Sequence, residues 1–229
     1  MAGPIRLRHS EESWDDERVD RQLRRPLANT FGATRCDPQH AAPPAYTGCR
    51  LEMDNGDLAL FAYHDDTGAY WLGNTETPKS LWRTNKKRFE KAPYPVSRWA
   101  QRELLSDLET AAPWLTAYDH VAWFFLPVLF SKDGRETTRA FFNNHAAGFP
   151  DASRDDGLAF YQRLLSTGVL DDHRYTMASK LGTSQQNDLV RMRATMAEFN
   201  AAQLLVEADQ TFTPEIELDS GYALDYRVH

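Results

Sequence analysis

The chain has 229 residues, of which 41% are hydrophobic, 12% aromatic and 26% charged. This composition excludes a disordered, collagen-like or disulfide-scaffolded chain and predicts one large domain or two small ones. The 33 acidic and 26 basic side chains give a formal net charge of -7, which argues against a globally basic nucleic-acid binder. Most of the excess acid lies in residues 101–229, and most of the basic side chains are arginine.

The two cysteines, Cys36 and Cys49, are expected to be reduced, because they form a lone pair in a chain without a secretory leader. A zinc site would have to recruit His40 and His64, and the resulting spacing matches no structural zinc pattern.

The sequence predicts a cytoplasmic protein with no membrane partner. Residues 1–17 lack the apolar core of a signal peptide. The longest apolar run, residues 121–130, is too short to span a bilayer and contains Pro127.

The N-terminal part of the chain predicts little regular structure. Prolines interrupt the polar residues 1–50, so we expect an irregular segment that wraps the domain, with one short helix near residues 13–23. Residues 58–63 and 69–72 flank the turn sequence Asp-Asp-Thr-Gly, which predicts a β-hairpin.

From residue 97 the spacing of apolar residues becomes helical. The expected helices cover residues 97–112, 133–147, 153–168, 172–181 and 184–208. Asp133 and Ser153 are the expected N-caps of two of them. The last helix carries an apolar stripe at heptad-like spacing, which we interpret as a core face rather than a partner-binding seam. Residues 215–218 and 222–228 then alternate like two strands.

These elements predict an α+β fold with an N-terminal β-hairpin region, a central helical cluster and a C-terminal strand pair. The expected segments are an irregular N-terminal part (1–50), a β-hairpin and basic segment (51–96) and a helical region that ends in the strand pair (97–229). The strand pair would be the start of a nuclease-like α/β core.

Three short motifs have simpler interpretations than the sites they resemble. Residues 66–69 spell the aspartic-protease sequence Asp-Thr-Gly-Ala, but a turn between two strands explains the same letters. Residues 151–162 begin like a calcium loop, yet Asp156 replaces its glycine and Gln162 its final glutamate, so a helix cap fits better. A metal site could also be drawn from His120, His145, His173 and Glu198, but no pair of them has the i, i+4 spacing of a local metal motif.

A basic segment interleaved with aromatic residues is the strongest functional signal. Between residues 79 and 102 Glu90 is the only acidic residue. Basic groups neutralise phosphates while aromatic rings stack on unpaired bases, so the segment is typical of a single-strand or RNA surface. The candidate residues are Lys86, Lys87, Arg88, Arg98 and Arg102 for phosphates, with Trp82 and Trp99 for stacking. The alternative is an ordinary solvated face whose aromatic rings point inward.

The C-terminal strand pair carries a second partial signal. Metal-dependent nucleases of the restriction-endonuclease type hold a divalent ion between an Asp and a following acid-x-Lys on adjacent strands. Here Asp219 and Asp225 would be the Mg²⁺ ligands, but Arg227 replaces the lysine. The chain as it stands is therefore expected to be inactive as such a nuclease.

Several longer runs resemble a haloarchaeal protein family of unknown function. They are residues 70–78 (YWLGNTETP), 124–138 (FFLPVLFSKDGRETT), 145–151 (HAAGFPD) and 175–182 (YTMASKLG). The resemblance implies an archaeal cytoplasm and assigns no catalytic residue. Members of the family look longer, with a nuclease-like α/β part downstream, which implies that this chain is a shortened member.

The function remains unknown at this point, and three hypotheses stay open. The first is a nucleic-acid-associated protein without catalytic activity or cofactor. The second is a Mg²⁺-dependent nuclease-like enzyme that is incomplete here, and the third is a protein-protein interaction or scaffold protein.

Overall fold

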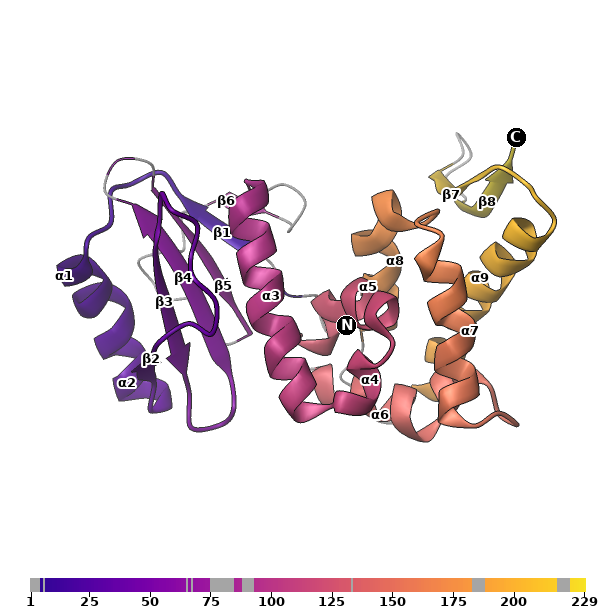
Figure 1. The fold of residues 1–229 in the computed structure, drawn as a ribbon, viewed down its shortest axis with the longest axis horizontal. Helices are drawn as coiled ribbons and strands as arrows, with labels where there is room; N and C mark the ends of the chain where they lie inside the picture. The colour runs from indigo at the N-terminus through magenta and orange to yellow at the C-terminus, as the bar shows by residue number, and fades with distance from the viewer. Residues whose placement is uncertain are drawn as a thin grey trace. The chain divides into compact units, whose positions relative to one another are not determined.

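The computed structural model describes residues 5, 7–64, 66, 68–74, 85–87, 93–132, 134–182, 188–217 and 223–229. The chain divides into two compact units. The sheet unit comprises the described part of residues 4–111 with residues 130–132, and the helical unit comprises residues 112–129 and the described part of 133–229. Figure 1 shows the elements of both units.

The sheet unit is built on a six-stranded antiparallel sheet with the strand order β2-β3-β4-β5-β1-β6. Its strands are β1 (Leu7–Ser10), β2 (Thr34–Cys36), β3 (Thr47–Glu52), β4 (Leu58–His64), β5 (Gly68–Gly73) and β6 (Asn85–Lys87). The hairpin expected from the sequence is confirmed, because β4 and β5 pair from Ala59 opposite Gly73 to His64 opposite Gly68.

The expectation that residues 1–50 are irregular apart from one helix is wrong. This segment supplies β1, β2 and part of β3, and β1 lies inside the sheet between β5 and β6. The expected helix is present and longer, running through α1 (Asp16–Val19), the π-helical turn η1 (Asp20–Arg24) and α2 (Arg25–Phe31). Strands β1 and β2 escape sequence analysis because they are short and mostly polar, and the partners of β1 lie far away along the chain.

The first face of the sheet packs against α1 and α2 (Figure 1). The core cluster on this side joins Trp14 and Leu23 to sheet residues that alternate along their strands, such as Cys49, Phe61 and Trp71. Trp14 meets Phe61 edge to face, with ring centroids 5.0 Å apart.

The opposite face is covered by α3 (Tyr94–Ala111) (Figure 1). Arg50 and Gly48 of β3 contact α3, while their neighbour Cys49 lies in the cluster of the first face. Leu60 pairs with Arg50 across the strands and therefore shares its face. Burial on both faces explains why residues 58–63 read as a continuous apolar run.

The helical unit contains a set of packed helices followed by a strand pair. The elements are α4 (Pro113–Thr116), α5 (Asp119–Leu129), α6 (Arg135–Asn144), the 3-10 turn η4 (Ala146–Gly148), α7 (Arg154–Ser166), the 3-10 turn η5 (Asp171–His173), α8 (Arg174–Leu181), α9 (Leu189–Glu207), β7 (Phe212–Glu217) and β8 (Ala223–Val228). Ser153 caps α7 as expected, since its hydroxyl accepts the backbone N–H of Asp156. Asp133 lies outside the described residues, and Gly134 occupies the N-cap of α6.

Aromatic side chains form the centre of the helical unit. Phe124 and Phe125 of α5 lie against Phe199 of α9, with ring centroids 5.6 Å and 5.4 Å apart, and Phe125 also meets Phe142 of α6. Pro127 is accommodated inside α5, in the run that the sequence marked as apolar. Throughout the described ranges, no helix combines the length and apolarity needed to cross a bilayer.

The strand pair at the end of the chain is confirmed, since β7 and β8 are antiparallel from Phe212 opposite Val228 to Glu217 opposite Ala223. The protein therefore has the expected α+β fold. Helix α3 belongs to the sheet unit, since its buried face packs on the sheet, where Glu103 pairs with Arg50.

Candidate functional site

The exposed face of α3 gathers the part of the basic segment that the structure describes. Val96, Trp99 and Glu103 point toward the sheet, whereas Tyr94, Arg98 and Arg102 follow one another at intervals of one helical turn on the outside. Pro95 is tolerated because it occupies the first turn, where its missing N–H is not needed. We call Tyr94, Arg98 and Arg102 the α3 outer face.

Tyr94 is 72% exposed, and the Arg98 guanidinium lies 6.0 Å from the centre of its ring. Arg98 Nη1 also donates to the Tyr94 hydroxyl at 3.4 Å. This ring and its neighbouring cation are therefore available together to a ligand.

The two α3 arginines differ from those of α1 and α2. There every arginine from residue 18 to residue 25 pairs with a carboxylate. Arg98 donates to the Tyr94 hydroxyl, and Arg102 donates to Nδ1 of His40 at 3.0 Å. Within the described residues neither of them pairs with an acid, so their positive charges remain uncompensated.

Trp99 is not a stacking residue, so this prediction is wrong. Its ring is only 4% exposed, and its indole N–H donates to the backbone oxygen of His40 at 3.0 Å. The ring also lies against Gly48 of β3, where a Cβ would stand 3.4 Å from it. Helical periodicity explains the outcome, because Trp99 shares the inward face with Glu103 while Arg98 and Arg102 share the outward one.

The other predicted nucleic-acid residues are only partly described. Lys86 and Lys87 lie on the edge strand β6, opposite Arg8 and Leu7 of β1. Trp82 and Arg88 lie outside the described residues. Their proposed contacts stay predictions.

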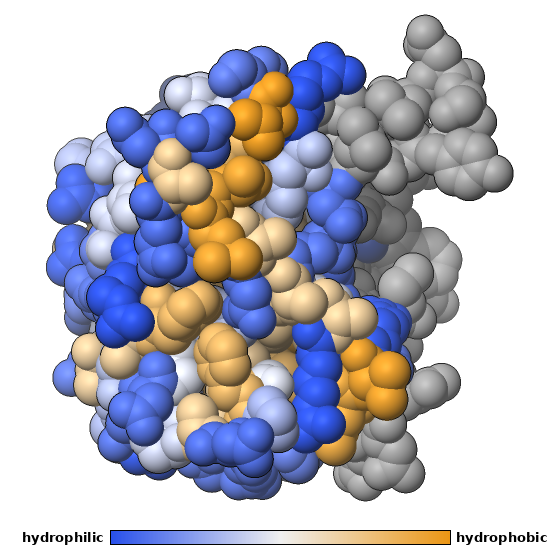
Figure 2. Space-filling view, turned by 90° about the vertical axis from the view of Figure 1, so that its right-hand side faces the viewer, coloured by the Kyte–Doolittle hydropathy of each residue, from blue (hydrophilic) through white to orange (hydrophobic). Residues whose placement is uncertain are grey.

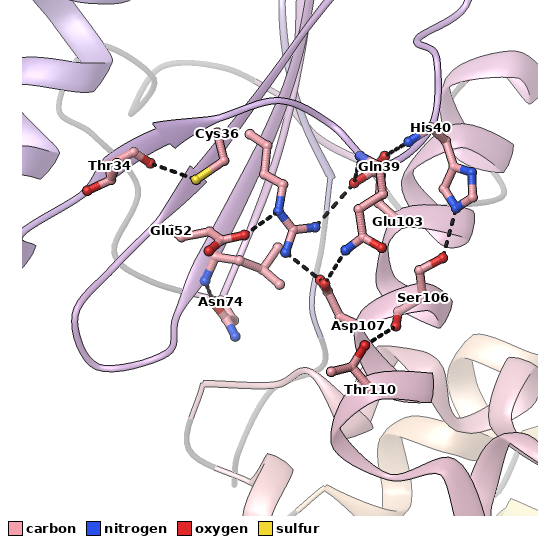
Figure 3. A network of polar contacts seen from close by, with 12 residues as sticks. Thr34, Cys36, Gln39, His40, Glu52, Asn74, Glu103, Ser106, Asp107 and Thr110 are labelled. Atoms are coloured by element: carbon pink, nitrogen blue, oxygen red, sulfur yellow. Dashed lines mark hydrogen bonds and ion pairs between the residues drawn. The ribbon is translucent and has the colours of Figure 1, made fainter.

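A buried ion-pair network lies beneath the α3 outer face (Figure 3). Arg50 of β3 donates from Nε to Glu52 at 2.6 Å, from Nη1 to Glu103 at 3.2 Å and from Nη2 to Asp107 at 2.7 Å. Glu103 has no exposed side-chain surface and also accepts the backbone N–H groups of Gln39 and His40. The network therefore joins the sheet, α3 and the loop before β3.

One guanidinium faces three carboxylates in this network. Burial alone would lower the pKa of Arg50, but hydrogen bonds to Asp107 and Glu52 outweigh it and raise the pKa above its usual value. Burial raises the pKa of the Asp107 carboxyl, and the bond from Arg50 only partly opposes this. The complete burial of Glu103 and its bonds to strand, helix and loop indicate a structural clamp. Asp107 Oδ2 is the one atom of this network that is buried without a hydrogen-bond partner among the described residues.

His40 and Ser106 lie 2.8 Å apart, Nε2 to Oγ, a distance typical of a catalytic base and its nucleophile. The rest of the geometry opposes that role. A guanidinium can only donate, so His40 Nδ1 accepts from Arg102 and the ring proton sits on Nε2, which donates to Ser106. The histidine therefore cannot take the proton of Ser106, and the pair is a positioning contact.

The metal hypotheses receive little geometric support. Wherever the structure describes side chains, it brings no three His, Cys, Asp or Glu together in a way that would hold a metal ion. This covers the set of His120, His145, His173 and Glu198, the last of which pairs with Lys180 at 2.6 Å. Asp225 is exposed on β8, whereas Asp219 lies outside the described residues, so the Mg²⁺ pair stays a prediction.

A small polar cavity of about 120 Å³ lies beside the turn after α6. Ala146 and Ala147 adopt left-handed backbone conformations there, with φ of 44° and 53°. Arg154 lines the cavity, but its Nε pairs with Asp155 at 2.9 Å and its Nη1 donates to Asn143 at 3.1 Å. The charge of Arg154 is thus balanced within the chain.

Sequence reasoning missed two features of the candidate site. Tyr94 is not among the predicted stacking residues, although it lies four residues before Arg98 and eight before Arg102, a spacing that marks the same helical face. The Arg50–Glu103 pair left no local signal, because its members come from distant elements.

No curated protein and no solved structure matches the chain. A family model described as "Family of unknown function (DUF5784)" matches residues 2–229. The chain therefore belongs to this family of unknown function.

Proposed function

We propose that the protein is a cytoplasmic, nucleic-acid-associated protein of an archaeon that binds single strands through the α3 outer face and has no catalytic activity of its own. The observation that carries the proposal is the exposed Tyr94 ring with the Arg98 guanidinium beside it.

The chemistry of this face suits an unpaired strand. A base can stack on the exposed ring, and such stacking contributes about 1–3 kcal/mol per base. Arg98 and Arg102 stand one helical turn apart, about 6 Å along the axis, and carry charges that no carboxylate of the described residues neutralises. Phosphates would supply that missing counter-charge.

The acidic net charge of the chain restricts the binding surface to a local patch. Long-range attraction of a polyanion is weak for a chain with charge -7, so affinity must come from short-range contacts at the α3 outer face. Lys86 and Lys87 on β6 would add phosphate contacts in the same unit. Duplex DNA, whose bases are already stacked, should bind more weakly than single strands.

The test is fluorescence anisotropy with labelled single-stranded DNA, single-stranded RNA and duplex DNA at 50 and 200 mM salt. Tyr94→Ala should weaken single-strand binding by about tenfold or more without changing the salt dependence. Arg98→Ala combined with Arg102→Ala should weaken binding and reduce the salt slope by about one to two units.

Arg21→Ala combined with Arg25→Ala is the matched control, because it removes the same charge from arginines that already pair with Glu17 and Asp20. The proposal fails if the wild-type chain does not bind at 50 mM salt, or if the control loses as much affinity as the α3 variants. Mg²⁺-dependent cleavage of the labelled strands that Asp225→Asn abolishes would instead support the nuclease-like alternative.

A further inference from the structure

Helix α9 is apolar on two opposite faces. Its buried face carries Met192, Met196 and Phe199, which lie in the helical core. A second set of apolar residues recurs on the outer side at alternating intervals of four and three residues, the spacing of a coiled-coil seam. This outer stripe consists of Val190, Ala194, Ala197, Ala201, Leu204 and the C-cap Ala208.

The outer stripe is open to solvent. Val190 is 81% and Leu204 66% exposed, and the alanines between them are exposed or half-buried. Figure 2 shows several apolar patches on this side of the molecule, with hydrophilic residues around and between them. A row of exposed apolar residues along one helix marks an interaction surface more often than a single exposed leucine does.

The sizes of the side chains indicate what covers the stripe. If a second α9 ran antiparallel, each layer of the seam would join residues equidistant from position 199. Val190 would then face Ala208 of the second copy, and Leu204 would face Ala194. Ala197 and Ala201 would meet at the centre, where small side chains allow two helices to approach closely. Every large residue would thus be matched by a small one.

The charges beside the stripe fit the same arrangement. Arg193 and Glu207 lie on one flank of α9. Arg193 is seven residues before Asn200 and Glu207 seven residues after it, so each lies about 10 Å from Asn200 along the helix axis. In an antiparallel pair this flank faces its own copy, so Arg193 would meet Glu207 of the second chain, and the two-fold axis would repeat the pair. Both residues are exposed, and neither has a protein counter-ion among the described residues.

We propose that the protein self-associates through α9, whose outer stripe packs antiparallel on the same stripe of a second copy with Arg193–Glu207 ion pairs on its flank.

A parallel pair of α9 helices fits less well, because Val190 and Leu204 would each meet the same residue of the second copy while alanine faced alanine between them. In the parallel arrangement, the acid on the flank opposite Arg193 would be Glu198 of the second copy. Glu198 already pairs with Lys180 of its own chain at 2.6 Å. Antiparallel packing also aligns the helix dipoles favourably.

One helix pair buries less than the roughly 1,600 Å² of a standard stable interface. The dimer is therefore expected to be weak and concentration-dependent, in the micromolar range. Sedimentation velocity between about 1 and 200 µM should show the average mass rising from the chain mass of 26.2 kDa toward twice that value.

Charge-swapped variants test the orientation. Arg193→Glu and Glu207→Arg should each weaken the dimer several-fold, and the double variant should restore it. Leu204→Glu should give a monomer at all concentrations. Arg163→Glu, on the exposed side of α7, is the control and should leave self-association unchanged. Circular dichroism verifies that each variant keeps its helices.

The proposal is overturned if the wild-type chain stays monomeric at 200 µM, or if Leu204→Glu dimerises as the wild type does. It is also overturned if the double charge variant dimerises as weakly as the single variants. In the antiparallel arrangement the swapped charges pair again, so the double variant must regain affinity. A parallel dimer would show itself by insensitivity to Glu207→Arg.

Discussion

The guanidinium of Arg50 and the carboxylate of Glu103 form an ion pair, Nη1 to Oε2 at 3.2 Å, with 7% and 0% of their side-chain surfaces exposed. Arg50 comes from a strand and Glu103 from the helix that covers it, so the pair ties the two layers of the sheet unit together. Glu103 also accepts two backbone N–H groups of the preceding loop, at 3.1 Å from Gln39 and 2.6 Å from His40. The loop, the strand and the helix thus depend on one carboxylate.

Glu103→Gln should destabilise the protein by about 3 kcal/mol, the usual effect of breaking a buried ion pair on one side. The amide NH₂ group of the glutamine would face Arg50 or the backbone N–H groups of Gln39 and His40, which are donors and need an acceptor. Urea denaturation followed by circular dichroism measures the change. Glu17→Gln, in an exposed pair with Arg21, should change the free energy of unfolding by less than about 1 kcal/mol. Equal effects of the two substitutions would contradict the clamp role of Glu103.

Gly157→Ala should destabilise the protein, although alanine is the better helix former. A Cβ at this position in α7 would stand 2.3 Å from the backbone oxygen of Ala146, which belongs to the left-handed turn after α6. Helix propensity alone would stabilise by about 1 kcal/mol, whereas the clash should destabilise by about 2 kcal/mol. Thermal unfolding decides the sign, with Arg163→Ala in the same helix as a control. A melting temperature raised by Gly157→Ala would show that the turn is not held against α7.

Arg174→Lys should destabilise the helical unit even though the charge is kept. Arg174 is 2% exposed, its guanidinium lies 3.9 Å from the centre of the Trp123 ring, and it donates to the backbone oxygens of Trp123 and Phe124. Lysine has neither the planar stacking surface nor the forked donors, so we expect a loss of about 2 kcal/mol. Intrinsic tryptophan fluorescence during urea unfolding provides the measurement. Unchanged stability in Arg174→Lys would show that only the charge matters.

The sequence predicted those elements whose signal is local. The hairpin of β4 and β5 follows from two apolar runs around a turn, and α7 from Ser153 with a helical stripe behind it. In both cases the residues that form the element also carry the evidence for it. The exposed arginines of α3 can also be predicted from the local sequence, since helical spacing fixes which residues share a face.

The elements that the sequence missed depend on distant partners. Three of the four residues of Leu7–Ser10 are polar or charged, and the segment becomes a strand because β5 and β6 flank it. Trp99 and Tyr94 are both aromatic residues of one basic segment, and the composition of the segment does not separate them; their places on α3 and the packing against Gly48 make Trp99 the buried one. Arg50 reads as a surface residue until Glu103 and Asp107 surround it. Local propensity holds no information about such pairings.

The two cysteines should differ in reactivity. Cys49 is buried among the residues of the first sheet face, whereas Cys36 is partly exposed. Burial raises the pKa of the Cys49 thiol from 9.0 to about 11. At pH 8 the thiolate of Cys49 is therefore scarce as well as inaccessible. Iodoacetamide should label Cys36 and leave Cys49 unmodified until urea unfolds the sheet unit, and mass spectrometry of the digested protein distinguishes the sites.

The same pKa shift makes the stability depend on alkaline pH. In the unfolded chain the Cys49 thiol ionises from about pH 9, while in the folded protein it stays neutral up to about pH 11. The folded state then binds the extra proton, so stability is intact below pH 9 and falls by up to about 2 kcal/mol as pH rises to 11. Cys49→Ala removes this group, so its urea midpoint should fall less between pH 8 and pH 10.5 than that of the wild type. Parallel declines in the two proteins would mean that Cys49 does not ionise differently on unfolding, and the alkaline loss would then belong to other groups such as Tyr63, whose pKa burial also raises.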